Sequence, residues 1–104
     1  MSFNYDQQAR EDFQGNKNTC ISWYLLSSYS YYCAYESLLQ DTTYDRLCKY
    51  ILENYERIEH HHKHLVDIEA LRAGTGYQIK TYPLIVQSCA EGLIREMLSR
   101  RNME

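Results

Sequence analysis

Two features that this chain lacks limit the classes of protein to which it can belong. It has no apolar run close to the roughly 20 residues that a helix needs to cross a bilayer. It also lacks any basic cluster larger than Arg95, Arg100 and Arg101, and its formal net charge is −3. Without a long apolar run, the chain is not expected to span a membrane. Proteins that bind DNA by themselves present a clustered basic face, so we do not expect autonomous nucleic-acid binding either.

Cysteine pairs with CxxC spacing are absent as well. The cysteines stand far apart, at Cys20, Cys33, Cys48 and Cys89, and the polar, acidic amino-terminal residues do not resemble a secretory signal peptide. In a reducing compartment such cysteines remain free thiols and pack as small apolar residues. We therefore expect a cytoplasmic protein whose cysteines are reduced thiols in the core.

Phenylalanine and tryptophan are scarce, whereas tyrosine is abundant. The chain contains 2 Phe and 1 Trp but 11 Tyr among its 104 residues, and 44% of the residues are apolar. This length and composition are typical of one folded domain. A tyrosine buries its ring and still offers a hydroxyl group, so the tyrosines suit both a partly polar core and a binding surface.

The spacing of the apolar residues predicts helices and no strand. Residues 20–35 are so rich in apolar and aromatic side chains that this helix is expected to be covered on more than one side. Residues 44–58 carry an apolar stripe at intervals of three and four residues. A shorter helix is predicted at residues 63–72, ended by Gly74. A last helix is predicted to begin near Pro83, with these residues inward: Leu84, Ile85, Cys89, Leu93, Ile94, Met97 and Leu98.

These elements predict an all-α fold, a small single domain of about four helices. The helical domain would span residues 19–104, with a central antiparallel helical hairpin within residues 19–60. Residues 1–18 are mostly polar, and we expect them to form a flexible N-terminal arm with at most one short helical turn around Ala9 to Phe13.

The most informative segment reads YYCAYESLLQDTTYDRL and runs from Tyr31 to Leu47. A pair of tyrosines ends one predicted helix, a short connection follows, and Asp-x-x-Tyr-Asp-Arg-Leu opens the next helix. This arrangement resembles the N-terminal, NMN-binding domain (domain Ia) of bacterial NAD-dependent DNA ligases, in which a Tyr-His pair precedes the same motif at the same spacing. With weaker similarity further along the chain, the resemblance covers roughly a third to a half of the sequence.

The resemblance implies a site for the nicotinamide mononucleotide half of NAD. Its residues would be Tyr31, Tyr32, Asp41, Tyr44 and Asp45, with the rings against the nicotinamide and the carboxylates near the ribose or carboxamide. Tyr32 stands where the family has histidine. Because a tyrosine cannot become cationic near neutral pH, a charged phosphate contact at this position is not expected.

The same residues also have a purely structural interpretation. Asp41 and Asp45 would then complete the cap of a helix, and Tyr44 would pack inward. The two interpretations differ in the placement of Tyr31 and Tyr44. These rings would face each other across a slot for a flat heterocycle in the first case, and would be sealed in the core in the second.

The chain lacks the catalytic motif of the ligases. Their nucleophile is the lysine of Lys-x-Asp-Gly, which forms a covalent adduct with AMP. The lysines here are Lys17, Lys49, Lys63 and Lys80, and none is followed by x-Asp-Gly. We therefore expect a stand-alone, non-catalytic relative of the nicotinamide-binding domain that binds NMN or NAD or serves as an accessory domain. A detached domain of this kind suggests a phage or prophage origin.

A second hypothesis keeps the helical hairpin without a nucleotide ligand. The protein would then be a small protein–protein interaction module whose partner surface is the tyrosine-rich first helix, since tyrosine is enriched at interfaces.

A histidine cluster interrupts the middle of the chain. It comprises His60, His61, His62 and His64, of which His60 and His64 would share one helical face and could hold zinc or nickel. No acidic or thiol residue is spaced to complete a closed site, so we expect no metal.

Overall fold

The computed structural model describes residues 3–103 and contains five α-helices: α1 (Asp6–Gly15), α2 (Thr19–Cys33), α3 (Asp41–Asn54), α4 (Ile68–Ala73) and α5 (Leu84–Asn102). Two 3₁₀ turns, η1 (Tyr55–Arg57) and η2 (Lys63–Leu65), lie between α3 and α4. No strand occurs within these described residues. The prediction of a small all-α domain is confirmed, with one helix more than the predicted number of about four.

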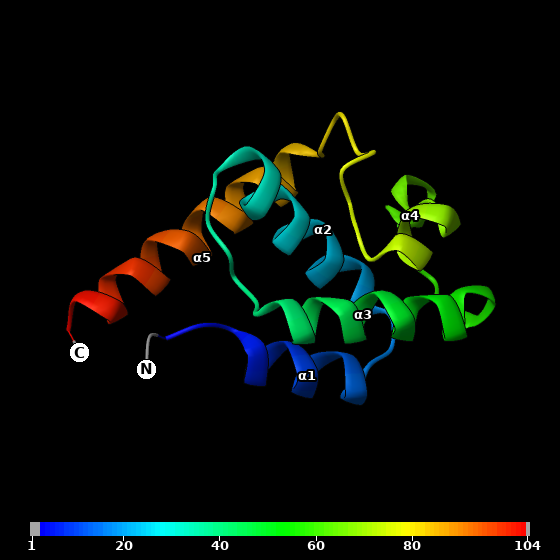
Figure 1. Ribbon diagram of the computed structural model, residues 1–104, viewed down its shortest axis with the longest axis horizontal. Helices are drawn as coiled ribbons and strands as arrows, with labels where there is room; N and C mark the ends of the chain where they lie inside the picture. The colour runs from blue at the N-terminus through cyan, green and yellow to red at the C-terminus, as the bar shows by residue number, and fades with distance from the viewer. Residues whose placement is uncertain (1–2, 104) are drawn as a thin grey trace.

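Helix α2 is the centre of the domain, because α1, α3 and α5 all pack against it. Its side chains Cys20, Ile21, Tyr24 and Leu25 are completely buried, as expected for a helix that is covered on several sides. In Figure 1, α2 runs leftward and α3 runs back to the right beneath it, so the two form the central hairpin. The connection between them, residues 34–40, forms the corner at which the candidate site lies.

The predicted flexible arm is wrong for residues 6–15. They form α1, which lies alongside the hairpin (Figure 1) and packs on α2. Tyr5, Ala9 and Phe13 are spaced four residues apart and are 3%, 0% and 2% exposed. This spacing places them on one helical face, and burial of that face stabilises a segment whose composition is mostly polar.

Helix α3 follows the predicted stripe, with Leu47, Cys48 and Ile51 completely buried. The regular helix ends at Asn54, and Ile58 is reached through η1 rather than through a continuous helix. The helix predicted at residues 63–72 begins only at Ile68, because the side chain of Asp67 accepts a hydrogen bond from the backbone N–H of Glu69 at 3.3 Å. It ends as predicted at Gly74, which has a φ of +70°.

Helix α5 begins directly after Pro83 and buries Ile94 and Met97 as predicted, but the predicted residues near its amino end are exposed. Its buried residues are Val86, Ala90, Ile94 and Met97, whereas Leu84 and Ile85 are 78% and 63% exposed. Helix α5 packs against α2, and its buried face includes the small, completely buried Ala90, which hydrophobicity alone does not single out.

The cysteines divide into two pairs. Cys20 and Cys48 are buried, and burial raises the pKa of each thiol to about 12. Cys33 and Cys89 are exposed, so the prediction that all of them are core thiols is wrong for these two. Among residues 3–103, no helix is both long and apolar enough to span a membrane.

Candidate ligand-binding pocket

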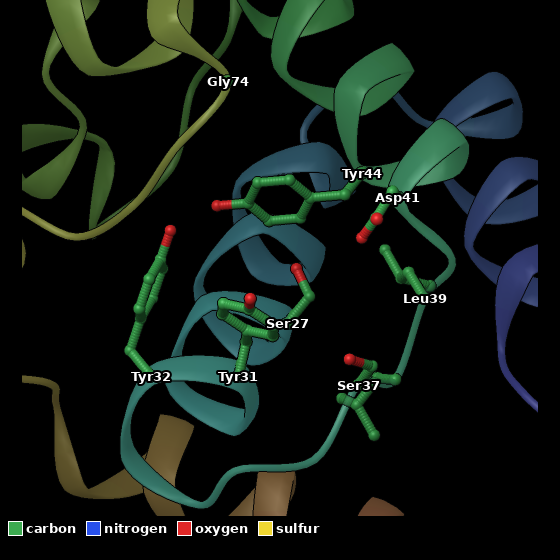
Figure 2. Close-up of a pocket in the computed structure, with 9 residues that line it drawn as sticks. Ser27, Tyr31, Tyr32, Ser37, Leu39, Asp41, Tyr44 and Gly74 are labelled. Atoms are coloured by element: carbon green, nitrogen blue, oxygen red, sulfur yellow. The ribbon is translucent and has the colours of Figure 1, made fainter.

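An open pocket of about 160 Å³ lies where α2 ends and α3 begins. Figure 2 shows Tyr31 and Tyr44 on opposite sides of this pocket, with Tyr32 beside them and Asp41 near its mouth. The residues that line it are Ser27, Tyr31, Tyr32, Ser37, Leu38, Leu39, Asp41, Tyr44 and Gly74. The structure thus brings four of the five residues indicated by the sequence motif to one hollow.

The corner that shapes the pocket is built by the connection between the two helices. Tyr35 has a φ of +59°, a left-handed conformation that is uncommon for a residue with a side chain and that turns the chain out of α2. Leu38 and Leu39 are then buried, which anchors the connection in the core. The backbone N–H of Gln40 donates to Asp6 Oδ1 at 2.8 Å, so α1 also holds the start of α3 in position.

Tyr44 forms the fixed wall of the pocket. One face of its ring stacks on Tyr24, with centroids 5.9 Å apart and an interplanar angle of 21°. Its hydroxyl lies 2.7 Å from Ser28 Oγ, and the two share a hydrogen bond. Burial raises the pKa of Tyr44 far above its ordinary value. The phenol is therefore neutral, held at both its ring and its oxygen, and it offers apolar surface to the pocket.

Tyr31 and Tyr32 form the opposite and adjacent walls. Their rings meet edge to face at 4.9 Å and 89°, a favourable arrangement for aromatic pairs. The Tyr32 hydroxyl lies 2.6 Å from Thr75 Oγ1 and shares a hydrogen bond with it. Tyr31 is 55% exposed, so it lines the pocket from the solvent side and is not sealed in the core.

The two aspartates of the motif differ in position. Asp41 lines the pocket, and Figure 2 shows its carboxylate directed toward the hollow between Tyr44 and Leu39. Asp45 does not line it, and its Oδ2 is 3.2 Å from Lys49 Nζ on the exposed side of α3. The two residues are four apart in α3, but only Asp41 lies at the corner.

The sequence motif did not indicate the segment that closes the pocket from the far side. Gly74 lines the pocket, and the next residues contact the tyrosines directly. Tyr24 donates a hydrogen bond to Thr75 O at 2.6 Å. A Cβ atom on Gly76 would clash with Ser28 Oγ and would lie 2.9 Å from the Tyr44 hydroxyl. The two glycines of the Gly-Thr-Gly sequence at residues 74–76 are the sequence signal that could have indicated this close approach.

The size and lining of the pocket determine what it can hold. A cavity of about 150 Å³ takes a benzene molecule, whereas sites for drug-sized ligands are about 300–1,000 Å³. At about 160 Å³, this pocket fits one aromatic ring, and any larger ligand must extend out of it. Asp41 is its single charged lining residue, and a carboxylate only accepts hydrogen bonds. A ring that carries N–H or O–H donors therefore suits it best.

The histidine cluster lies elsewhere and is engaged in the fold. The backbone N–H of His62 donates to His60 Nδ1 at 3.0 Å, and His60 Nε2 lies 2.8 Å from Ser22 Oγ. Because Nδ1 accepts a hydrogen bond, the proton of the neutral ring is on Nε2. Burial and the neighbouring histidines lower the pKa of His60. Within residues 3–103, no group of three or more His, Cys, Asp or Glu side chains is placed to hold a metal ion.

Comparisons with known proteins leave the pocket as the main guide to function. No protein-family model matches the chain, and neither a curated protein nor a solved structure is significantly similar to it.

Proposed function

We propose that this protein binds the nicotinamide ring of NMN or NAD in the tyrosine pocket, as a non-catalytic relative of the NMN-binding domain of NAD-dependent DNA ligases. One observation carries the proposal. The residues Tyr31, Tyr32, Asp41 and Tyr44, indicated by a spacing pattern, line one open pocket of about 160 Å³, the size of one aromatic ring.

The walls suit a flat, electron-poor heterocycle. The Tyr44 and Tyr32 hydroxyls are already hydrogen-bonded to Ser28 and Thr75, so these side chains offer mainly ring surface to a ligand. Stacking or edge-to-face packing on such rings contributes about 0.5–1.5 kcal/mol beyond the buried area. The Asp41 carboxylate would accept a hydrogen bond from the carboxamide N–H₂ or from a ribose hydroxyl.

The proposed role is to bind a ligand without catalysing a reaction. The pocket lining contains no lysine, cysteine or histidine, which are the usual nucleophiles and general bases. The chain also has no Lys-x-Asp-Gly. It would serve as an accessory domain or nucleotide carrier rather than as a ligase.

A protein–protein interaction module is the second candidate, favoured by exposed tyrosines near the same corner. Tyr31, Tyr35 and Tyr77 are 55%, 87% and 67% exposed, and Tyr77 meets Tyr32 edge to face at 5.7 Å. Exposed aromatic groups of this kind are enriched in protein interfaces.

Titration calorimetry with nicotinamide, NMN, NAD and AMP would test the nucleotide proposal. We expect weak binding of NMN and NAD, about tens of micromolar or weaker, because this small pocket encloses only the ring of the ligand. Tyr31→Ala should lower the affinity about fivefold, which corresponds to the loss of about 1 kcal/mol of aromatic contact. The thermal midpoint should change little, since Tyr31 is 55% exposed.

Tyr35→Ala provides the matched control. Tyr35 is an exposed tyrosine of the same corner that does not line the pocket, so its removal should leave nicotinamide nucleotide affinity unchanged. Tyr44→Ala is a poorer test, because it would also break the contacts with Tyr24 and Ser28. The absence of detectable binding at millimolar NMN and NAD would reject the nucleotide proposal in favour of the interaction module.

A further inference from the structure

We infer that Arg101, at the carboxyl end of α5, supplies the phosphate-binding group of this site, so that the ligand is a nucleoside monophosphate unit held from ring to phosphate. The inference rests on the proposed function, since it concerns the part of the same ligand that projects from the tyrosine pocket.

A second hollow continues the tyrosine pocket toward Arg101. It has a volume of about 450 Å³ and is lined by Asn4, Ser37, Leu39, Gln40, Asp41, Thr42 and Arg101. Ser37, Leu39 and Asp41 also line the tyrosine pocket, so the two hollows share one wall and adjoin each other. We call the second hollow the Arg101 groove. A ligand whose ring fills the smaller pocket has room here for its remaining atoms.

Arg101 is the one basic residue in the lining of the two hollows. Its Nε donates a hydrogen bond to the backbone oxygen of Phe3 at 2.8 Å, which orients the guanidinium. Within residues 3–103, no carboxylate forms an ion pair with it. Its neighbour Arg100 instead pairs with Glu96 at 3.0 Å and lies over the Phe3 ring. Of the two, Arg101 is the guanidinium available to bind an anion.

Other groups in the groove are suited to the same role. Asn4 Oδ1 accepts a hydrogen bond from the backbone N–H of Asp6 at 2.9 Å, so its N–H₂ group is the part left to bind a ligand. The Thr42 hydroxyl belongs to the first turn of α3, whose amino end favours negative charge. These donors add to the guanidinium, which makes the strongest contact because hydrogen bonds between ionised partners are about twice as strong as neutral ones.

The order of the groups matches the order of a nucleotide. The tyrosine rings suit the base, and Asp41 lies in the wall shared by the two hollows. A carboxylate there accepts from sugar hydroxyls but would repel a phosphate placed against it. The phosphate must therefore lie further along the groove, on the side of Arg101. Tyr32, which is neutral and bonded to Thr75, cannot replace this cation.

The test compares nicotinamide riboside with NMN, which differ only in the phosphate. For the wild-type protein, calorimetry should show NMN binding about tenfold more tightly, as expected for a charge-assisted hydrogen bond. Arg101→Gln should abolish this preference and leave riboside affinity unchanged, whereas Arg101→Lys should retain part of it. Arg95→Gln is the matched control, since it removes the same charge from an exposed part of α5 and should keep the tenfold preference.

The outcomes separate the two proposals. Riboside binding without a preference for NMN, or a preference that survives Arg101→Gln, would overturn the role of Arg101 and leave the tyrosine pocket as the ring site. Failure of both riboside and NMN to bind would reject the proposed function, and the Arg101 inference with it. Because Arg101→Gln also removes the bond to Phe3, unchanged riboside affinity in this variant serves as its check on folding.

Discussion

Two hollows flank α2, and they use their polar side chains differently. The tyrosine pocket lies at the carboxyl end of the helix. A groove of about 250 Å³ lies along its amino-terminal half, lined by Ser22, Leu25, Leu26, His60, His61, His62, Ile85, Val86 and Cys89. In the pocket, the Tyr32 and Tyr44 hydroxyls bond to Thr75 and Ser28. In the groove, both His60 nitrogens are hydrogen-bonded within the protein.

The difference lies in what each hollow leaves for a ligand. The pocket combines aromatic walls with the Asp41 carboxylate, an acceptor that can orient a ring. In the groove, the central polar group, His60, is already bonded, and the apolar rim contains Ile85, which is 63% exposed. Binding sites for small molecules pair apolar walls with a few polar groups that fix orientation. The pocket meets this description, whereas the groove has mainly shape and apolar surface.

The largest expected difference is in the stability lost when an aliphatic side chain is truncated, in α3 or at the rim of the groove. Leu47 of α3 is completely buried, whereas Ile85 at the rim of the groove is 63% exposed. Leu47→Ala should lower the free energy of unfolding by about 2–5 kcal/mol, and Ile85→Ala should change it by less than about 0.5 kcal/mol. Urea unfolding measures both. A large loss from Ile85→Ala would mean that the groove is part of the core or is covered by another chain.

A smaller effect should follow from adding one methyl group behind the tyrosine pocket. The Cβ of Gly76→Ala would lie within 3 Å of Ser28 and Tyr44, so the variant should displace the Tyr44 hydroxyl and lose about 1–3 kcal/mol of stability. Nicotinamide affinity should fall with it.

Gly92→Ala is the control for the glycine replacement. Gly92 lies within α5, and its added Cβ would meet nothing closer than Arg95 Nη2 at 3.9 Å. The variant should stabilise the protein by about 0.5–1 kcal/mol, because glycine is a poor helix former. Equal effects of the two variants in thermal unfolding would contradict the close contact at Gly76.

The smallest expected effect is the change of protein stability with pH that arises from His60 in the groove. Its pKa is lowered from 6.5, first by burial and then by His62 and His61. As the pH falls below about 6.5, the unfolded chain takes up a proton more readily than the folded protein. The free energy of unfolding should therefore have its full value above this pH. It should decrease as the pH falls from there toward and past the lowered pKa of the folded state.

Thermal midpoints measured between pH 7.5 and pH 5 on wild type and His60→Gln would show the contribution of this residue. The decline with acid should be shallower in His60→Gln, whereas His64→Gln, at an exposed position and not among the groups that lower the pKa of His60, should keep the wild-type slope. Equal slopes in all three proteins would show that His60 is not held in its neutral form.

The sequence by itself determined the elements whose signals are local. The apolar stripe from Tyr44 to Ile51 predicted the buried face of α3, and Gly74 predicted the end of a helix. The spacing between Tyr31 and Asp41 also indicated the corner at which a pocket lies. Periodicity and turn chemistry act over a few residues, so they can be recognised without knowing the rest of the fold.

Only the tertiary structure decided which faces meet. It buried Ala9 and Phe13 of a polar segment, and it turned Val86 and Ala90 inward in place of Leu84 and Ile85. It also brought Gly74 to the tyrosines and placed Asp45 outside the pocket. It set Arg101 in the Arg101 groove, beside Asp41. These placements depend on contacts between residues distant in the chain. The free energy of such contacts comes from packing and from hydrogen bonds between elements, which no local pattern records.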